Sequence, residues 1–456
     1  MATTEFSRHT HVPQSGSFGR DRITQWHPDD GRFWERTGRA VARRNLVCSI
    51  AIDHLGFCTW LLWSVTVWDL RSNGMVLSVG QTLWLTTIPN LVGAALRIPY
   101  TFAPARYGGR NWSVISAALL LVPWALFMYA ASHPGLPYWA LLPIAATAGV
   151  GGGIFASSMS NITHFYPADK QGLPLGLNAA GGNLGASVTQ LTIPPLVLTV
   201  GLVNLGLVWM PLIIIAAVCA YVFMDNLASA TSAYSLAELK RIGRERHTLI
   251  MSILYVGTFG SFIGYSFSFG VLTRIEFPDI RIAQFIWIGA LVGAAARPLG
   301  GWLADRFGGA RVTMIDFVLL AVGIVAVAVA SRAQSWPWYL CAFLFVFAAT
   351  GIGNGSTYKM IPAIFRARVQ ETGRPASMTA RRNAAAAIGI VSAAGAVGGA
   401  LIQQVFRVSL DASGSILPAL AALAIFYLLC MALTWAYYLR KDRTGHNGVS
   451  LAEVGV

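Results

Sequence analysis

Apolar stretches of about twenty residues recur along the whole chain, and they constrain its fold more than any other feature. One helical crossing of a lipid bilayer needs about 20 predominantly apolar residues. Twelve such stretches follow one another, at 45–67, 80–104, 112–131, 137–165, 172–200, 203–224, 248–272, 283–304, 312–331, 336–362, 384–406 and 415–438. Because 55% of the residues are hydrophobic and 11% are charged, the chain has too little polar surface for a soluble body of its size. The sequence therefore predicts an all-α polytopic membrane protein with twelve transmembrane helices.

The net charge of +14 would suggest a nucleic-acid partner in a soluble protein, so its location along the chain matters. Eight Arg precede Leu46, fourteen Lys or Arg fall in the even-numbered loops, and three follow Leu439. The loops of the other side hold five: Arg71, Arg274, Arg281, Arg332 and Arg407. This asymmetry is the positive-inside bias, and it predicts cytoplasmic N- and C-termini. It argues against a nucleic-acid partner.

The first forty residues are polar and have no apolar core of the signal-peptide type, so we expect no cleaved signal. Trp26, Phe33 and Trp34 stand among Arg and Asp residues, which favours an interfacial segment with its aromatic rings at headgroup level. The five cysteines are scattered and lack metal-ligand spacing. We expect neither a metal site nor a cofactor.

The two halves of the chain repeat one another. Leu-Val-Gly-Ala-Ala-Leu-Arg at 91–97 matches Leu-Val-Gly-Ala-Ala-Ala-Arg at 291–297, an offset of 200 residues. A Gly-rich run at 179–190 matches one at 393–404, and three glycines at 149–153 match three at 351–355. Three pairs in one order indicate a 6+6 duplication of the kind found in rocking carriers. We therefore expect two pseudo-symmetric six-helix halves.

This duplication divides the chain into five parts: a cytoplasmic segment 1–44, an N-terminal half 45–224, a cytoplasmic linker 225–247, a C-terminal half 248–438 and a cytoplasmic tail 439–456.

Arg97 and Arg297 are the residues most suggestive of function. An arginine inside a bilayer costs roughly 2.5–3.5 kcal/mol on insertion scales and therefore tends to face a protein-lined cavity. Each is followed by eight or so residues of apolar helix, which places it about 12 Å deep by helix rise. Their symmetric repetition predicts that they face each other across a central cavity, although snorkelling to the headgroups is the structural alternative.

Spans 2, 4, 5, 7, 10 and 11 contain no acidic residue that could neutralise these arginines. The missing counter-charge is therefore expected to be the substrate, and a planar fork of N–H donors suits a small oxyanion. Lys359 in span 10 adds a third positive charge. It could contact the anion, act as a proton-linked switch, or snorkel from the cytoplasmic end of its span.

Small and aromatic residues flank the expected cavity. Gly181 and Gly185, like Gly395 and Gly399, form small-x-x-x-small pairs that allow close helix packing and could leave room for an anion. Uncharged donors and rings could line the site, although rings in membrane helices more often serve packing: Asn183, Asn161, Ser158, Gln190, Phe155, Tyr255 and Phe259.

Two further charged pairs have other expected roles. Asp305 and Arg306, at the cytoplasmic end of span 8, are expected to lock helices together in one state of a gating cycle. Asp53 and His54 lie inside the first apolar stretch. We expect a structural salt link there, with a proton-coupling site as the alternative.

The motifs resemble those of the nitrate/nitrite porter family (NarK-like) of the major facilitator superfamily, in order and over about residues 45–438. The resemblance rests on residues 96–100, 155–159, 176–185 with Gln190, 258–264 and 297–301. It implies that Arg97 and Arg297 clamp the anion, that Phe155, Tyr255 and Phe259 line its site, and that Asn183, Gly395 and Gly399 belong to the family's signatures. Lys359 and the Asp53–His54 pair depart from the family pattern.

The resemblance implies a carrier of nitrate and nitrite in the inner membrane, with a role in nitrate assimilation and functional coupling to a nitrate reductase. Exchange of the two anions is the expected mechanism, because an empty pair of arginines in an occluded cavity would repel each other. Proton-coupled nitrate symport, a porter of another small monovalent anion, and a non-transporting anion sensor are the alternatives. We expect a monomer in the lipid bilayer, and no enzyme.

Overall fold

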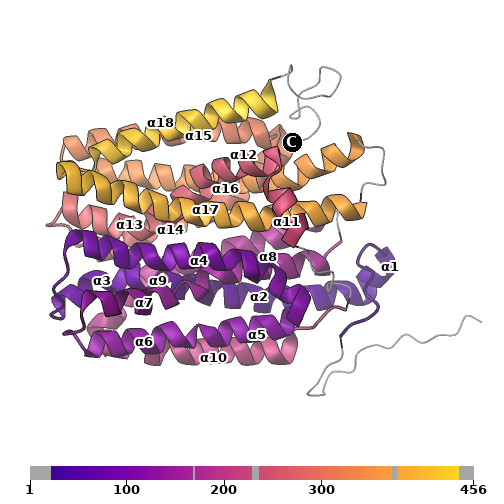
Figure 1. Ribbon diagram of the computed structural model, residues 1–456, viewed down its shortest axis with the longest axis horizontal. Coiled ribbons are helices and arrows are strands. Elements are labelled where there is room, and N and C mark those ends of the chain that lie inside the picture. Colours follow the sequence, from indigo (N-terminus) through magenta and orange to yellow (C-terminus); the bar gives the residue numbers. More distant parts are fainter. Residues whose placement is uncertain (1–21, 168–169, 229–235, 372–376, 441–455) are drawn as a thin grey trace, which may run out of the picture.

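The chain folds into one bundle of long helices in the computed structural model, which describes residues 22–167, 170–228, 236–371, 377–440 and 456. Figure 1 shows α1, α11 and the chain's C-terminal end at one end of the bundle, here called the linker end; the opposite end is the far end. Parts of the predicted N-terminal segment, linker and tail lie outside the described residues.

The helices up to residue 223 are the following: α1 (Gly31–Phe33), a π-helical turn η1 (Trp34–Gly38), α2 (Arg39–Trp60), α3 (Leu62–Ser72), α4 (Val79–Tyr107), α5 (Gly109–Leu119), α6 (Leu121–Ser132), α7 (Tyr138–Thr147), α8 (Val150–Phe165), α9 (Gly172–Val200), η3 (Leu202–Asn204) and α10 (Leu205–Phe223).

The remaining helices are α11 (Leu236–Gly243), α12 (Arg246–Tyr255), a π-helical turn η5 (Val256–Gly260), α13 (Ser261–Glu276), η6 (Ile282–Gln284), α14 (Ile286–Phe307), α15 (Gly309–Arg332), α16 (Trp336–Glu371), α17 (Ser377–Ser413), α18 (Leu417–Thr434) and η7 (Trp435–Leu439).

Several of these helices join end to end into single membrane crossings. α2 and α3 meet at Leu61, and α12 runs through η5 into α13. Among the described residues, ten helical segments are long and apolar enough to cross a membrane. Two further helices of 29 residues, α4 and α9, run alongside them. Both carry polar side chains, including Arg97 and Asn183, that lower their hydropathy. Together these segments account for the twelve predicted crossings.

The two halves that repeat in sequence also repeat the same close packing of helices. A Cβ atom added to Gly149 would come within 2.8 Å of the Gly93 backbone nitrogen, so α8 lies directly on α4. In the other half, a Cβ atom on Gly351 would come within 2.1 Å of the Gly293 carbonyl oxygen, so α16 lies equally close to α14. The loops after α4 and α14 also match, because Gly108 and Gly308 both adopt φ near +90° (+91° and +88°). Only glycine adopts such angles without strain.

Two of the three N-terminal aromatic side chains are buried in the protein. Trp26 and Trp34 are 7% and 5% exposed, and they pack against Phe165 and Tyr166 at the end of α8. The Trp26 indole also donates to the carbonyl oxygen of His164 at 3.1 Å. These two rings therefore pack against partners within the protein. Helix also begins earlier than the predicted span, at Gly31.

Hydrogen bonds join the two halves at the far end of the bundle. The hydroxyls of Thr86 and Thr87 in α4 donate to the side-chain oxygen of Gln403 in α17, at 3.0 and 3.2 Å. The Ser187 hydroxyl in α9 donates to the carbonyl oxygen of Trp287 in α14 at 2.9 Å. In this conformation the halves are therefore closed against each other at that end.

Candidate functional site

Arg97 lies on α4 with no exposed surface. Its Nε donates to the carbonyl oxygen of Gly152 in α8, and its Nη1 donates to that of Ser392 in α17, both at 3.1 Å. The guanidinium carbon lies 4.8 Å from the ring centroids of both Phe155 and Phe259. Arg97 thus bridges the two halves and sits among aromatic faces, which stabilise a cation. The snorkelling alternative does not describe this geometry.

Arg297 occupies the equivalent place on α14 and is 4% exposed. Its Nη2 donates a long hydrogen bond of 3.5 Å to the Tyr255 hydroxyl. Its guanidinium carbon lies 5.7 Å from the centroid of the Phe155 ring and 5.5 Å from that of Tyr358. Because Phe155 is a neighbour of both arginines, the two guanidinium groups converge on one ring at the interface of the halves.

The predicted aromatic residues form a stack beside this pair. The ring centroids of Phe155 and Phe259 are 6.1 Å apart and those of Phe259 and Tyr255 are 5.2 Å apart, with interplanar angles of 20° and 12°. The π-helical turn η5 places Tyr255 and Phe259 on one face of the seventh crossing. The stacked rings form flat walls next to the guanidinium groups of the two arginines. This arrangement suits a planar anion.

Several buried donors at the site have no hydrogen-bond partner among the described residues. They include Nη2 of Arg97 and Nη1 of Arg297. On α9, the buried Asn183 also has both side-chain amide atoms without a partner among the described residues, but it forms no hydrogen bond with the arginine pair. Because guanidinium N–H groups bind anion oxygens well, these two unpaired groups are available to a ligand between the halves.

Sequence reasoning missed three residues. Trp60 lies 5.4 Å from the guanidinium carbon of Arg97, and Tyr358 flanks Arg297. Asn354 is fully buried on α16, and neither of its side-chain amide atoms has a partner in the part of the chain that the structure describes. It stands between Gly353 and Gly355, and an amide in such a glycine run was the available signal.

Lys359 is directed away from the arginine pair. It forms an ion pair with Asp305 of α14, and both side chains are partly exposed, at 40% and 57%. The position fits the third of the three roles considered from the sequence, a cation reaching toward the end of its span. Asp305 thereby links α14 to α16. Arg306 lies over the rings of Trp302 and Phe307, at 5.8 and 5.6 Å from their centroids.

Asp53 and His54 do not form the expected salt link, because consecutive helical side chains diverge by about 100°. The His54 ring nitrogen Nδ1 lies 3.0 Å from the carbonyl oxygen of Gly181. The Asp53 carboxylate is fully buried, faces Gly182 of α9, and has no hydrogen-bond partner among the described residues. A second buried carboxylate in the same condition, Asp316 on α15, was missed from the sequence.

The four predicted glycines are points of close helix contact. Added Cβ atoms at Gly181 and Gly185 would lie 2.5 Å from Ile50 and 2.4 Å from the carbonyl oxygen of His54. Those at Gly395 and Gly399 would lie 2.6 Å from Tyr255 and 2.7 Å from Ile263. α9 therefore packs on α2 as α17 packs on the seventh crossing, and a larger residue at Gly395 would push against the rings of Tyr255 and Phe259.

A cationic site buried between two symmetric helical halves is the arrangement that an alternating-access carrier needs. Residues 54–380 match the Major Facilitator Superfamily, and the chain belongs to that superfamily of membrane transporters. The xylose transporter XylE of E. coli, in a partially occluded inward-open conformation, has the same fold, with a TM-score of 0.64 and 15% identity over 87% of this chain and 98% of that one.

Within the superfamily, the chain belongs to the family of nitrate/nitrite transporters. It is 38% identical to the nitrate/nitrite transporter NarU of Salmonella typhimurium, over 94% of this chain and 98% of the relative. It is 33% identical to a probable nitrate/nitrite antiporter, NarK2, of Thermus thermophilus, over 92% and 97% of the two chains. The predicted family and fold are thereby confirmed, and a family of carriers agrees with the expectation that the chain is not an enzyme.

Proposed function

We propose that this protein carries nitrate and nitrite across the membrane by alternating access, and that it exchanges one anion for the other. The observation that carries the proposal is the pair of buried arginines converging on Phe155, each with an N–H group that has no partner among the described residues. A planar oxyanion would complete both guanidinium groups. The names of the relatives, a nitrate/nitrite transporter and a probable antiporter, support the choice of anions.

Exchange follows from the fixed charge of the site. Arginine stays protonated at any biological pH, so an empty carrier that occludes Arg97 and Arg297 holds two like charges in a medium of low dielectric. That state is costly, and the empty carrier returns slowly. Either anion removes the repulsion, so each half of the cycle proceeds with one anion bound.

Proton-coupled symport is the second candidate, and Asp53 favours it. This carboxylate is buried on α2 against α9, the helix of Asn183, and the charges of Arg97 and Arg297 both act on it. A proton taken up there together with the anion would move with it through the cycle. Lys359 is less suited to this role, because its pairing with Asp305 lies outside the arginine cluster.

The remaining assignments belong to the same proposal. The protein works as a monomer in the inner membrane, with cytoplasmic termini and a cytoplasmic linker, and its two six-helix halves span 45–224 and 248–438. The positive-inside distribution of charge supports this orientation. A nitrate reductase in the cytoplasm would consume incoming nitrate and supply the nitrite for export.

The deciding experiment compares labelled nitrate uptake into proteoliposomes preloaded with nitrite and into empty vesicles with only an inward proton gradient. Exchange requires uptake in the first case and none in the second. Asp53→Asn should then leave the exchange rate within about twofold of wild type. Uptake driven by the proton gradient alone, abolished by Asp53→Asn, would instead establish symport. Vesicles with the Arg97→Lys variant provide the inactive control.

A further inference from the structure

We propose that a groove between α2 and α10 at the linker end binds the anionic headgroup of a membrane phospholipid. The groove has a volume of about 590 Å³ and lies outside the central site. Its walls include Glu35, Arg39, Arg43, Arg44, Val47 and Phe223. In the proposed orientation it opens to the cytoplasmic leaflet.

One face of a single helix supplies most of the wall. Glu35, Arg39, Arg43 and Val47 follow one another at intervals of four residues, so their side chains lie above one another along the helix that runs from η1 into α2. The second wall is the end of α10, where Phe223 is the last helical residue. The groove therefore grades from charged side chains to apolar ones along its length.

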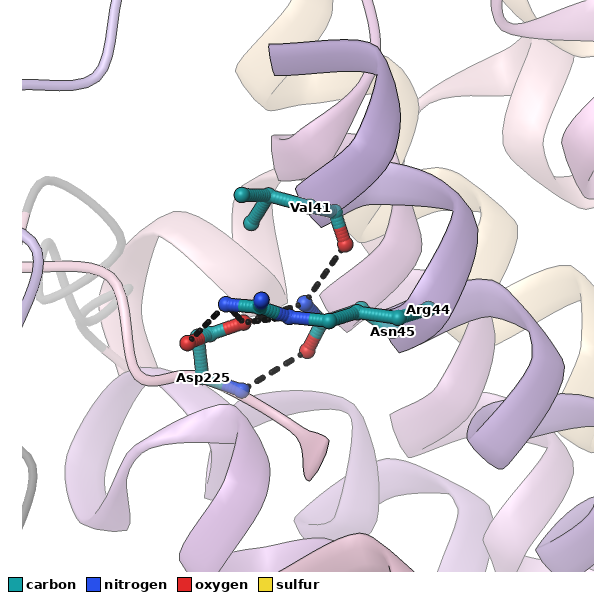
Figure 2. A network of polar contacts seen from close by, with 4 residues as sticks. All are labelled: Val41, Arg44, Asn45 and Asp225. Carbon is teal, nitrogen blue, oxygen red and sulfur yellow. Dashed lines mark hydrogen bonds and ion pairs between the residues drawn. The ribbon is translucent and has the colours of Figure 1, made fainter. Parts of the chain in front are cut away.

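Figure 2 shows how the back of the groove is fixed. Nε and Nη2 of Arg44 donate to the two carboxylate oxygens of Asp225, at 2.9 and 2.7 Å. Asn45 completes the network, because its side-chain oxygen accepts from the backbone N–H of Asp225 at 2.9 Å and its Nδ2 donates to the carboxylate at 2.8 Å. The Arg44 charge is thus balanced within the protein, and the first part of α2 is tied to Asp225, two residues after the end of α10.

Arg39 and Arg43 are different. Both are exposed, and neither side chain forms a hydrogen bond or an ion pair within the described part of the chain. Glu35 is the one carboxylate that shares their wall, so two cations face the groove with a single opposing charge. Guanidinium groups bind phosphate oxygens through two parallel N–H donors, which makes a phosphate the best-matched anion.

The apolar part of the groove identifies the source of that phosphate. Val47 and Phe223 are 59% and 52% exposed, and other apolar side chains near the end of α10, Val218 and Val222, are also exposed, at 55% and 43%. This is the surface that contacts acyl chains in a membrane-spanning bundle. A phospholipid places its phosphate at Arg39 and Arg43 and its chains on Val47 and Phe223, whereas free phosphate would leave the apolar wall unused. Basic pockets between helices on the cytoplasmic side are a known mode of anionic-lipid binding.

A lipid in this groove would bridge α2 and α10 at the point where the inter-half linker begins. It should therefore stabilise the folded N-terminal half as any ligand of the native state does.

The test uses the full chain purified in an uncharged detergent, with native mass spectrometry to count bound lipid and a thermal melt to measure stability. Phosphatidylglycerol should bind and raise the unfolding midpoint, and phosphatidylcholine should do so much less. The Arg39→Gln/Arg43→Gln double variant should bind phosphatidylglycerol at least tenfold more weakly. The matched control, Arg32→Gln/Arg36→Gln, removes two exposed charges from the same segment outside the groove and should bind as wild type does.

Two results would overturn the proposal. Equal binding of phosphatidylglycerol by the double variant and its control would remove the groove as the site. Inorganic phosphate that stabilises the protein as much as the lipid does, with no effect of Phe223→Ser, would make this a site for a free anion. If the double variant does not fold, the comparison of the two lipids on wild-type protein and on Phe223→Ser still decides the question. None of these outcomes depends on whether the protein carries nitrate.

Discussion

The two central arginines differ in how firmly the protein holds them. Arg97 donates to two backbone carbonyls on two different helices, whereas Arg297 has a single long hydrogen bond to Tyr255. In the proposed clamp, Arg97 is therefore the fixed side and Arg297 is the side with more freedom to move. The two arginines occupy equivalent positions in the sequence repeat, but their hydrogen bonding differs.

Replacing either arginine by lysine should lower anion uptake at least tenfold without unfolding the protein. A lysine retains the charge but has one ammonium in place of a planar fork, so it cannot keep the Gly152 and Ser392 contacts of Arg97 and also bind an anion. Uptake into nitrite-loaded proteoliposomes measures the effect, and Arg106→Lys, an exposed change at the end of α4, is the control. Wild-type rates in both central variants would remove the clamp from the mechanism.

The Tyr255→Phe substitution tests the contribution of the Tyr255 hydroxyl separately from that of its ring. The substitution deletes the acceptor of the Arg297 hydrogen bond and leaves the stack on Phe259 in place. We expect the hydroxyl to orient the Arg297 fork toward the anion, and a hydrogen bond of this kind is worth about 0.5–1.5 kcal/mol, so the apparent affinity for nitrate should fall roughly two- to tenfold. Tyr255→Leu, which also removes the stacked ring, should cost more. Equal effects of the two substitutions would show that the ring contributes nothing.

At the level of elements, close contact between α14 and α16 fixes the depth at which Arg297 sits. A Cβ atom on Gly300 would lie 2.0 Å from the carbonyl oxygen of Ile352, whereas one on the adjacent Gly301 would meet nothing within 4 Å. The two neighbouring glycines therefore form a matched pair of test positions.

Gly300→Ala should destabilise the protein by roughly 1–3 kcal/mol, because backbone atoms block the new methyl group and the helices must separate. Gly301→Ala should be nearly neutral. The unfolding midpoint in detergent and the nitrate uptake rate measure both effects. Loss of stability in Gly301→Ala, or none in Gly300→Ala, would contradict this account of the packing.

At the scale of the whole molecule, hydrogen bonds from Thr86 and Thr87 to Gln403 hold the two halves together at the far end. A carrier must break these contacts to expose its site on that side. They therefore set part of the balance between the two access states.

Gln403→Ala should shift this balance toward opening at the far end. In a variant without the native cysteines and with a cysteine at position 187, an impermeant thiol reagent added from the far side should label faster once Gln403 is replaced. Gln81→Ala is the control, because Gln81 forms hydrogen bonds with Ser78 at the start of α4, within its own half. Unchanged labelling in the Gln403 variant would mean that other contacts keep this end closed.

The sequence by itself determined the twelve crossings, the duplicated halves and the central positions of Arg97 and Arg297. Length and hydropathy are local properties of a membrane helix, and a repeat in sequence places equivalent residues at equivalent depths. Tertiary structure alone decided which neighbour each polar side chain meets. Lys359 joins Asp305, Asp53 faces Gly182, and Trp26 packs on Phe165. A helix that is apolar on all sides does not encode in its hydropathy which face meets which partner, so only the assembled bundle sets those contacts.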